Sequence, residues 1–230
     1  MTRTSTTLFT PNARPEAVFF DLDGTLADTA PDLGAAANRL RQSEGLPALP
    51  LEHLRPHTSH GVRGMLLAAF SMTPAHTAYA EYAERFLTYY AEHICEHTRL
   101  FEQMAEVLDR LDASGTKWGI VTNKRHQYTQ PLVTELGLMQ RAHCVISGDT
   151  AARPKPAPDP LLLACELTDT HPQNCVYVGD DVRDIQAGRA AGMVTAAAAY
   201  GYLGIDHPLT DWNAHFVIQS PIELLPACGL

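Results

Sequence analysis

The chain has 230 residues, of which 45% are hydrophobic and 19% charged, as in an ordinary globular protein with a sizeable core. Its net charge of -9 argues against a nucleic acid or an anionic membrane as partner, because both favour a basic surface. The five cysteines show no CxxC spacing, and no apolar run reaches the about 20 residues of a membrane span. Residues 1–15 are polar, lack a signal-peptide pattern and are expected to form a mobile leader, so we predict a cytoplasmic protein with reduced thiols.

The first predicted element is a buried strand that is followed at once by two acids. Residues 17–20 are apolar, Asp21 and Asp23 come next, and Gly24 ends the strand without a side chain in the way. Two carboxylates so close together repel each other, so this arrangement favours a bound cation.

Residues 30–98 contain no convincing strand and are predicted to be helical. Apolar residues recur at helical spacing in 30–46, and aromatic residues share one face of 73–94, where Thr73 and Pro74 are typical of a helix start. The aromatic face could pack in the core or stack on a ligand, and core packing is favoured.

From about residue 100 the pattern alternates between strands and helices, which predicts an α/β fold with a doubly wound parallel sheet. The expected strands are 117–123, 144–149, 175–181, 194–200 and 215–220, and the expected helices are 101–115, 130–138, 158–168 and 183–193. The core then comprises 1–29 and 99–230, with 30–98 as an inserted helical cap.

Polar side chains follow several of the predicted strands, where ligands bind to such sheets. Thr122 and Asn123 end one strand, Lys155 lies in the loop after the next, and Asp180 and Asp184 follow a third. Thr122 offers a hydroxyl and Asn123 a backbone N–H to phosphate oxygens. We therefore expect these groups to meet Asp21 at one edge.

The residue types at this edge support phosphoryl transfer. Asp21 is the best nucleophile, because a carboxylate can attack phosphorus, and Asp23 is placed to protonate the leaving oxygen and then deprotonate water. The gathered carboxylates favour Mg²⁺, and Lys155 adds a fixed positive charge. Mg²⁺ and Lys155 would thus make the site locally positive, as an anionic substrate requires, although the chain as a whole is negatively charged.

Four motifs, "DLDGTLADT", "VTN", "RPKPAPDP" and "GDDVRD", resemble those of haloacid dehalogenase superfamily phosphatases, and the insert resembles the cap of the phosphoglycolate phosphatase-like subgroup. The resemblance implies a Rossmann-like core with Asp21 as nucleophile, Asp23 as acid/base, and Thr122 and Lys155 on the phosphate. Asn123 and Gly24 are assigned to phosphate or substrate binding.

The same resemblance implies a Mg²⁺ site. Its ligands would be Asp21, the Asp23 backbone carbonyl and Asp180, with Asp184 ligating the ion or orienting a bound water. Asp181 does not match the motif's acidic positions and is treated as secondary.

The substrate is expected to be a small phosphate ester that is recognised by the cap segment 57–64. His60 and Arg63 could reach a substrate anion or hydroxyl, or could be surface residues of a helix–helix loop. Phosphoglycolate phosphatases often have Gly-Asn-Gly where this chain has Ser59-His60-Gly61. Other runs resemble phosphatases of N-acetylmuramic acid 6-phosphate, so both substrates stay open, with the sugar slightly favoured.

Two other functions share part of this pattern. A phosphomutase would use Asp21 and Asp23 but return phosphate to a bound intermediate. A signalling receiver domain is about half this length and carries its phosphorylated aspartate after a middle strand. A hydrolase, as a monomer or homodimer, is therefore preferred.

Overall fold

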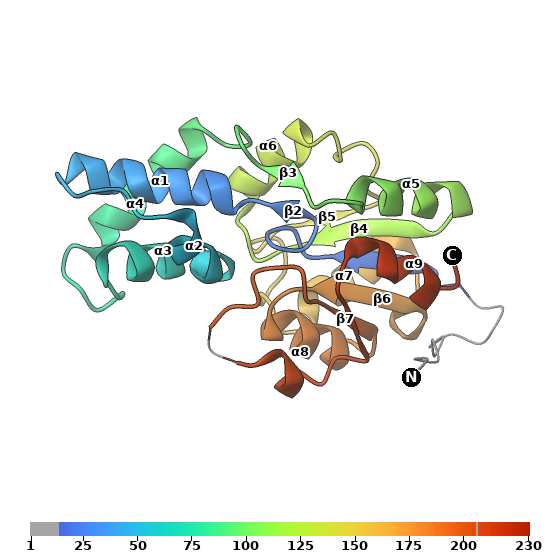
Figure 1. Ribbon diagram of the computed structural model, residues 1–230. Helices are drawn as coiled ribbons and strands as arrows, with labels where there is room; N and C mark the ends of the chain where they lie inside the picture. Colours follow the sequence, from blue (N-terminus) through green and yellow to red (C-terminus); the bar gives the residue numbers. More distant parts are fainter. Residues whose placement is uncertain (1–13, 206) are drawn as a thin grey trace, which may run out of the picture.

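The structure, a computed structural model, describes residues 14–205 and 207–230 (Figure 1). Its centre is a six-stranded parallel sheet in the order β5-β4-β1-β6-β7-β8. The strands are β1 Ala17–Phe20, β4 Lys117–Val121, β5 Val145–Ile146, β6 Cys175–Gly179, β7 Val194–Ala198 and β8 Phe216–Ile218. Because β1 lies between β4 and β6, the residues after it emerge in the middle of the sheet's carboxyl edge.

Helices cover both faces of the sheet. Val18 and Phe20 of β1 pack on one side and Phe19 on the other, as the alternation of side chains along a strand requires. The first side carries α5 Met104–Ser114, α6 His126–Glu135 and α9 Leu224–Ala227, and the second carries α7 Asp159–Thr168 and α8 Val182–Ala190. Three 3-10 turns complete the core, namely η2 Pro172–Asn174, η3 Leu209–Asp211 and η4 Pro221–Glu223. The predicted α/β doubly wound fold is confirmed.

Residues 30–98, here called the helical insert, form a separate group of helices beyond the carboxyl edge of the sheet (Figure 1). The group has its own apolar cluster, which includes the buried Leu40, Met65, Leu66 and Phe86. Its helices are α1 Ala30–Ser43, α2 Leu51–Leu54, η1 Arg55–His60, α3 Gly61–Phe70 and α4 Tyr79–Glu92.

The two connections to the insert are held side by side. Tyr202 Oη accepts hydrogen bonds from the backbone N–H of Thr29 at 2.7 Å and of Ala30 at 2.9 Å. The buried carboxylate of Asp32 accepts the N–H of Thr98 at 2.9 Å and its hydroxyl at 2.7 Å. The chain therefore enters and leaves the insert at one hinge.

The elements differ from the predictions mainly at their ends. Two short strands, β2 Ala27–Asp28 and β3 Arg99–Leu100, pair antiparallel at the hinge and are too short to leave a periodic pattern. Helix α4 begins at Tyr79 instead of Thr73, because residues 73–78 form hydrogen-bonded turns. In residues 14–205 and 207–230, no helix has the length and apolar character needed to cross a membrane.

Candidate active site

Lys155 lies at the carboxyl edge of the sheet between two aspartates. Its Nζ is 2.8 Å from Asp21 Oδ1 and 2.7 Å from Asp184 Oδ1, and it donates to the Tyr177 hydroxyl at 2.8 Å. Burial disfavours the charge of this ammonium, but Asp184 and Asp21 outweigh that penalty and raise its pKa. Lys155 is therefore a buried cation held between two carboxylates, and its expected role on a phosphate group stays a prediction. Tyr177, hidden in an apolar strand, is a partner that the pattern missed.

Asn123 and Thr122 stand beside this lysine. The Asn123 amide donates to the Lys155 carbonyl at 2.9 Å and accepts the Lys155 N–H at 3.0 Å, so the side chain holds the lysine's loop in place. The Thr122 hydroxyl oxygen accepts the Lys124 N–H at 3.1 Å, which leaves the hydroxyl hydrogen for an incoming anion.

Three aspartates form a compact acidic cluster next to Lys155. Oxygens of Asp21, Asp180 and Asp184 all lie within 4.8 Å of one another. Burial and then the charges of Asp21 and Asp184 raise the pKa of Asp180 well above its usual range. Burial likewise raises the pKa of Asp184 to about 7, although Lys155 opposes the shift. Buried carboxylate oxygens in this arrangement suit a hard divalent cation.

Gly24 packs directly against Asp180 of this cluster. Its φ is +87°, and a Cβ there would lie 2.2 Å from Asp180 Oδ2, so only glycine fits. Its N–H donates to the Ala27 carbonyl at 3.0 Å, and it does not line the cavity described below. Gly24 therefore packs closely against a metal-ligand candidate, and its expected part in phosphate or substrate binding stays a prediction.

Asp181 lies outside the acidic cluster and has a structural task. It caps α8 by accepting the Arg183 N–H at 2.9 Å, while Asp184 Oδ2 accepts the Asp181 N–H at 3.1 Å. Its carboxylate also pairs with the Arg183 side chain at 2.8 Å. Arg183 then donates to the Ser59 carbonyl of the helical insert at 2.8 Å, which links core and insert.

Asp23 faces a different cation. Lys124 Nζ lies 2.9 and 3.2 Å from its two carboxylate oxygens, and the Thr29 hydroxyl donates to it at 2.6 Å. The same ammonium lies 4.8 Å from the centre of the Tyr90 ring, which belongs to α4 of the insert. Sequence reasoning missed Lys124, although its place directly after "VTN" at a strand end is the signal that points to it.

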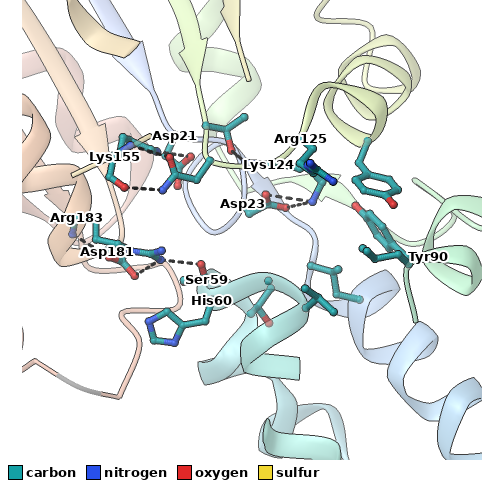
Figure 2. Close-up of a pocket in the computed structure, with 18 of the residues that line it drawn as sticks. Asp21, Asp23, Ser59, His60, Tyr90, Lys124, Arg125, Lys155, Asp181 and Arg183 are labelled. Carbon is teal, nitrogen blue, oxygen red and sulfur yellow. Dashed lines mark hydrogen bonds and ion pairs between the residues drawn. The ribbon is translucent and has the colours of Figure 1, made fainter. Parts of the chain in front are cut away.

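These residues open into a cavity of about 390 Å³ between the insert and the sheet edge (Figure 2). The core contributes Asp21, Asp23, Thr122, Asn123, Lys124, Arg125, Tyr128, Lys155, Asp181, Arg183 and Asp184, and the insert contributes Leu33, Thr58, Ser59, His60, Gly61, Val62, Phe86, Leu87 and Tyr90. His60 thus lines the cavity as expected. Arg63 does not line it, because it lies on the exposed side of α3.

Comparison with known proteins places the chain in a family. A sequence profile of the haloacid dehalogenase-like hydrolases matches residues 18–198. The chain therefore belongs to the haloacid dehalogenase-like hydrolase family, and within it to the phosphatases, as the relatives below indicate.

The chain is 40% identical over 211 residues to the N-acetylmuramic acid 6-phosphate phosphatase of Pseudomonas putida, covering 92% of this chain and 95% of the relative. It is 45% identical over 211 residues to the phosphoglycolate phosphatase of Xanthomonas campestris pv. campestris, covering 91% and 95%. The crystal structure of a predicted phosphoglycolate phosphatase from Haemophilus somnus 129PT superposes with a TM-score of 0.82 at 25% identity, covering 94% of this chain and 98% of that one.

Proposed function

We propose that this protein is a Mg²⁺-dependent phosphomonoester hydrolase that works through an aspartyl-phosphate intermediate on Asp21. The observation that carries the proposal is the ion pair of Asp21 with Lys155, which both line the cavity and lie next to the acidic cluster. This arrangement supports the proposal, because the chemistry needs a carboxylate, a positive charge and metal ligands close together.

In the first step, a carboxylate oxygen of Asp21 attacks phosphorus and the bond to the leaving alcohol breaks. Asp23 gives the departing oxygen its proton. In the second step Asp23 takes a proton from water as the water oxygen attacks phosphorus, which frees phosphate and restores Asp21. Lys155, the Thr122 hydroxyl and the Asn123 backbone N–H hold the phosphate oxygens.

We propose that Asp21, the Asp23 backbone carbonyl, Asp180 and Asp184 hold Mg²⁺. The buried, mutually repelling carboxylates support this assignment. When bound, the cation supplies positive charge between the carboxylates and the phosphate. EDTA is expected to stop the reaction and added Mg²⁺ to restore it.

We propose further that residues 1–29 and 99–230 form the catalytic core and that residues 30–98 act as a cap that sets specificity. His60, which lines the cavity, supports this proposal, whereas Arg63 is exposed and does not line the cavity. Replacing His60 by alanine should then reduce kcat/KM for the natural substrate far more than for p-nitrophenyl phosphate, a generic ester with few cap contacts.

The substrate proposed is N-acetylmuramic acid 6-phosphate, with phosphoglycolate as the alternative, because relatives of similar identity carry both names. The cavity volume of about 390 Å³ favours the larger molecule, since cavities for drug-sized ligands measure about 300–1,000 Å³. The test is kcat/KM for both compounds at equal Mg²⁺. A preference for phosphoglycolate of about tenfold or more, or roughly 1.4 kcal/mol, would reverse the choice.

A further inference from the structure

One side of the cavity is apolar and aromatic. Tyr90 of the insert and Tyr128 of α6 have ring centres 5.9 Å apart, and Phe86 and Leu87 of α4 and Leu33 of α1 continue this wall. The Tyr90 side chain is buried in this wall, and its ring lies against the Lys124 ammonium.

Arg125 differs from the other lysine and arginine side chains that line the cavity. Each of the others is paired with an aspartate of the site: Lys155 with Asp21, Lys124 with Asp23, and Arg183 with Asp181. Arg125 is exposed, and within the described part of the chain it forms no ion pair. A guanidinium in this state is suited to a carboxylate, which it can bind through two parallel hydrogen bonds.

The position of Arg125 decides which part of a substrate it would meet. Figure 2 shows Asp21 and Lys155 on one side of the cavity, Arg125 and Tyr90 on the other, and Asp23 between them. The phosphoryl group belongs beside Asp21, and the leaving oxygen belongs beside Asp23. The space toward Arg125 and the aromatic wall is therefore left for the alcohol.

We infer that Arg125 binds a carboxylate carried by the alcohol part of the substrate, while the wall around Tyr90 and Tyr128 packs against an apolar ring face of that alcohol. The inference rests on the proposed function and narrows the range of substrates that the enzyme is expected to accept. The substrate class is a phosphate ester of a ring-sized hydroxy acid whose carboxylate is remote from the phosphate, and Arg125 is the residue that selects it.

The experiment pairs one substitution with two sugars that differ in a single acid group. N-acetylmuramic acid 6-phosphate carries a lactyl carboxylate, and N-acetylglucosamine 6-phosphate has the same ring without it. Arg125→Gln should lower kcat/KM for the acid by roughly tenfold to a hundredfold, the range for hydrogen bonds between charged groups. For the neutral sugar and for p-nitrophenyl phosphate it should change kcat/KM by less than about threefold.

Arg110→Gln, a matched change on the exposed side of α5, serves as the control and should leave all three rates unchanged. Equal losses on the two sugars after Arg125→Gln would overturn the inference. A wild-type preference for phosphoglycolate over both sugars of about tenfold would also overturn it, yet leave the phosphatase function standing. If the wild-type protein hydrolyses none of these esters in the presence of Mg²⁺, p-nitrophenyl phosphate included, the proposed function itself fails.

Discussion

Lys124 and Asp23, which are 101 positions apart in the chain, form an ion pair with Nζ–Oδ distances of 2.9 and 3.2 Å. Lys124 follows β4 and Asp23 follows β1, and these neighbouring strands bring the two side chains together. The ion pair therefore fixes the position of the Asp23 carboxylate at the edge of the sheet. Because Lys124 also contacts the Tyr90 ring, the proposed acid/base is linked to the helical insert.

Replacing Asp23 by asparagine should separate the two chemical steps. With p-nitrophenyl phosphate the leaving group needs no proton, so Asp21 can still be phosphorylated. The attack of water lacks its base and should slow by about 10²–10⁴-fold. Stopped-flow absorbance should therefore show a burst of about one p-nitrophenol per enzyme, followed by a slow phase.

Asp109→Asn is the matched control for this experiment, because Asp109 is an exposed residue of α5 outside the cavity. It should show wild-type kinetics. Steady release of p-nitrophenol at the wild-type rate by the Asp23→Asn variant would show that Asp23 is not the acid/base of the reaction.

The acidic cluster predicts that Mg²⁺ stabilises the fold. A ligand that binds only the folded protein stabilises it by about 2.7 kcal/mol at a concentration of 100 times Kd. Thermal unfolding of the wild-type protein should shift upward as Mg²⁺ is added. Asp180→Asn removes one of the three candidate ligands, so the unfolding temperature of this variant should respond little to Mg²⁺. A wild-type response from the variant would argue against the site.

The contact from Arg183 to the Ser59 carbonyl predicts a role in holding the insert over the cavity. Arg183→Met breaks this hydrogen bond, and Asp181 keeps its cap on α8. We expect kcat/KM for the sugar phosphate to fall by roughly tenfold, as for one hydrogen bond from a charged group. Hydrolysis of p-nitrophenyl phosphate should be less affected, because that ester depends little on the insert.

Arg189→Met is the control on the same helix, since Arg189 donates to the Asn213 carbonyl, away from the cavity. Amide hydrogen exchange in η1 should increase in the Arg183→Met variant and stay unchanged in the control. Unchanged exchange and unchanged kinetics in both variants would mean that the contact does not hold the insert.

Strand order explains why much of the site could be predicted. Asp21, Thr122 and Asp180 lie at or directly after the ends of strands, and parallel strands bring such residues to one edge whatever their distance in the chain. The same rule would have found Lys124, which directly follows "VTN". Tyr177 could not be found in this way, because it lies inside an apolar strand and reads as core.

Details that depend on local backbone geometry were beyond the sequence pattern. His60 and Arg63 are three residues apart, yet Gly61 has a φ of 55° at the start of α3, and only His60 faces the cavity. Asp181 is treated as secondary from its motif position, and its capping bonds to α8 could be known only from the structure. The aromatic face of α4 was expected to be core, and Tyr90 is both buried and part of the cavity wall.

The central claim is that Asp21 is the nucleophile, and phosphate release by an Asp21→Asn variant tests it most directly. The change keeps the side-chain volume, so circular dichroism and the unfolding temperature should confirm an intact fold. Uncatalysed hydrolysis of phosphate monoesters is extremely slow, with enzymatic accelerations up to roughly 10²¹-fold, so background cannot hide the loss. The account predicts phosphate release below about a hundredth of the wild-type rate with Mg²⁺ present, whereas a rate of about a tenth or more would contradict it.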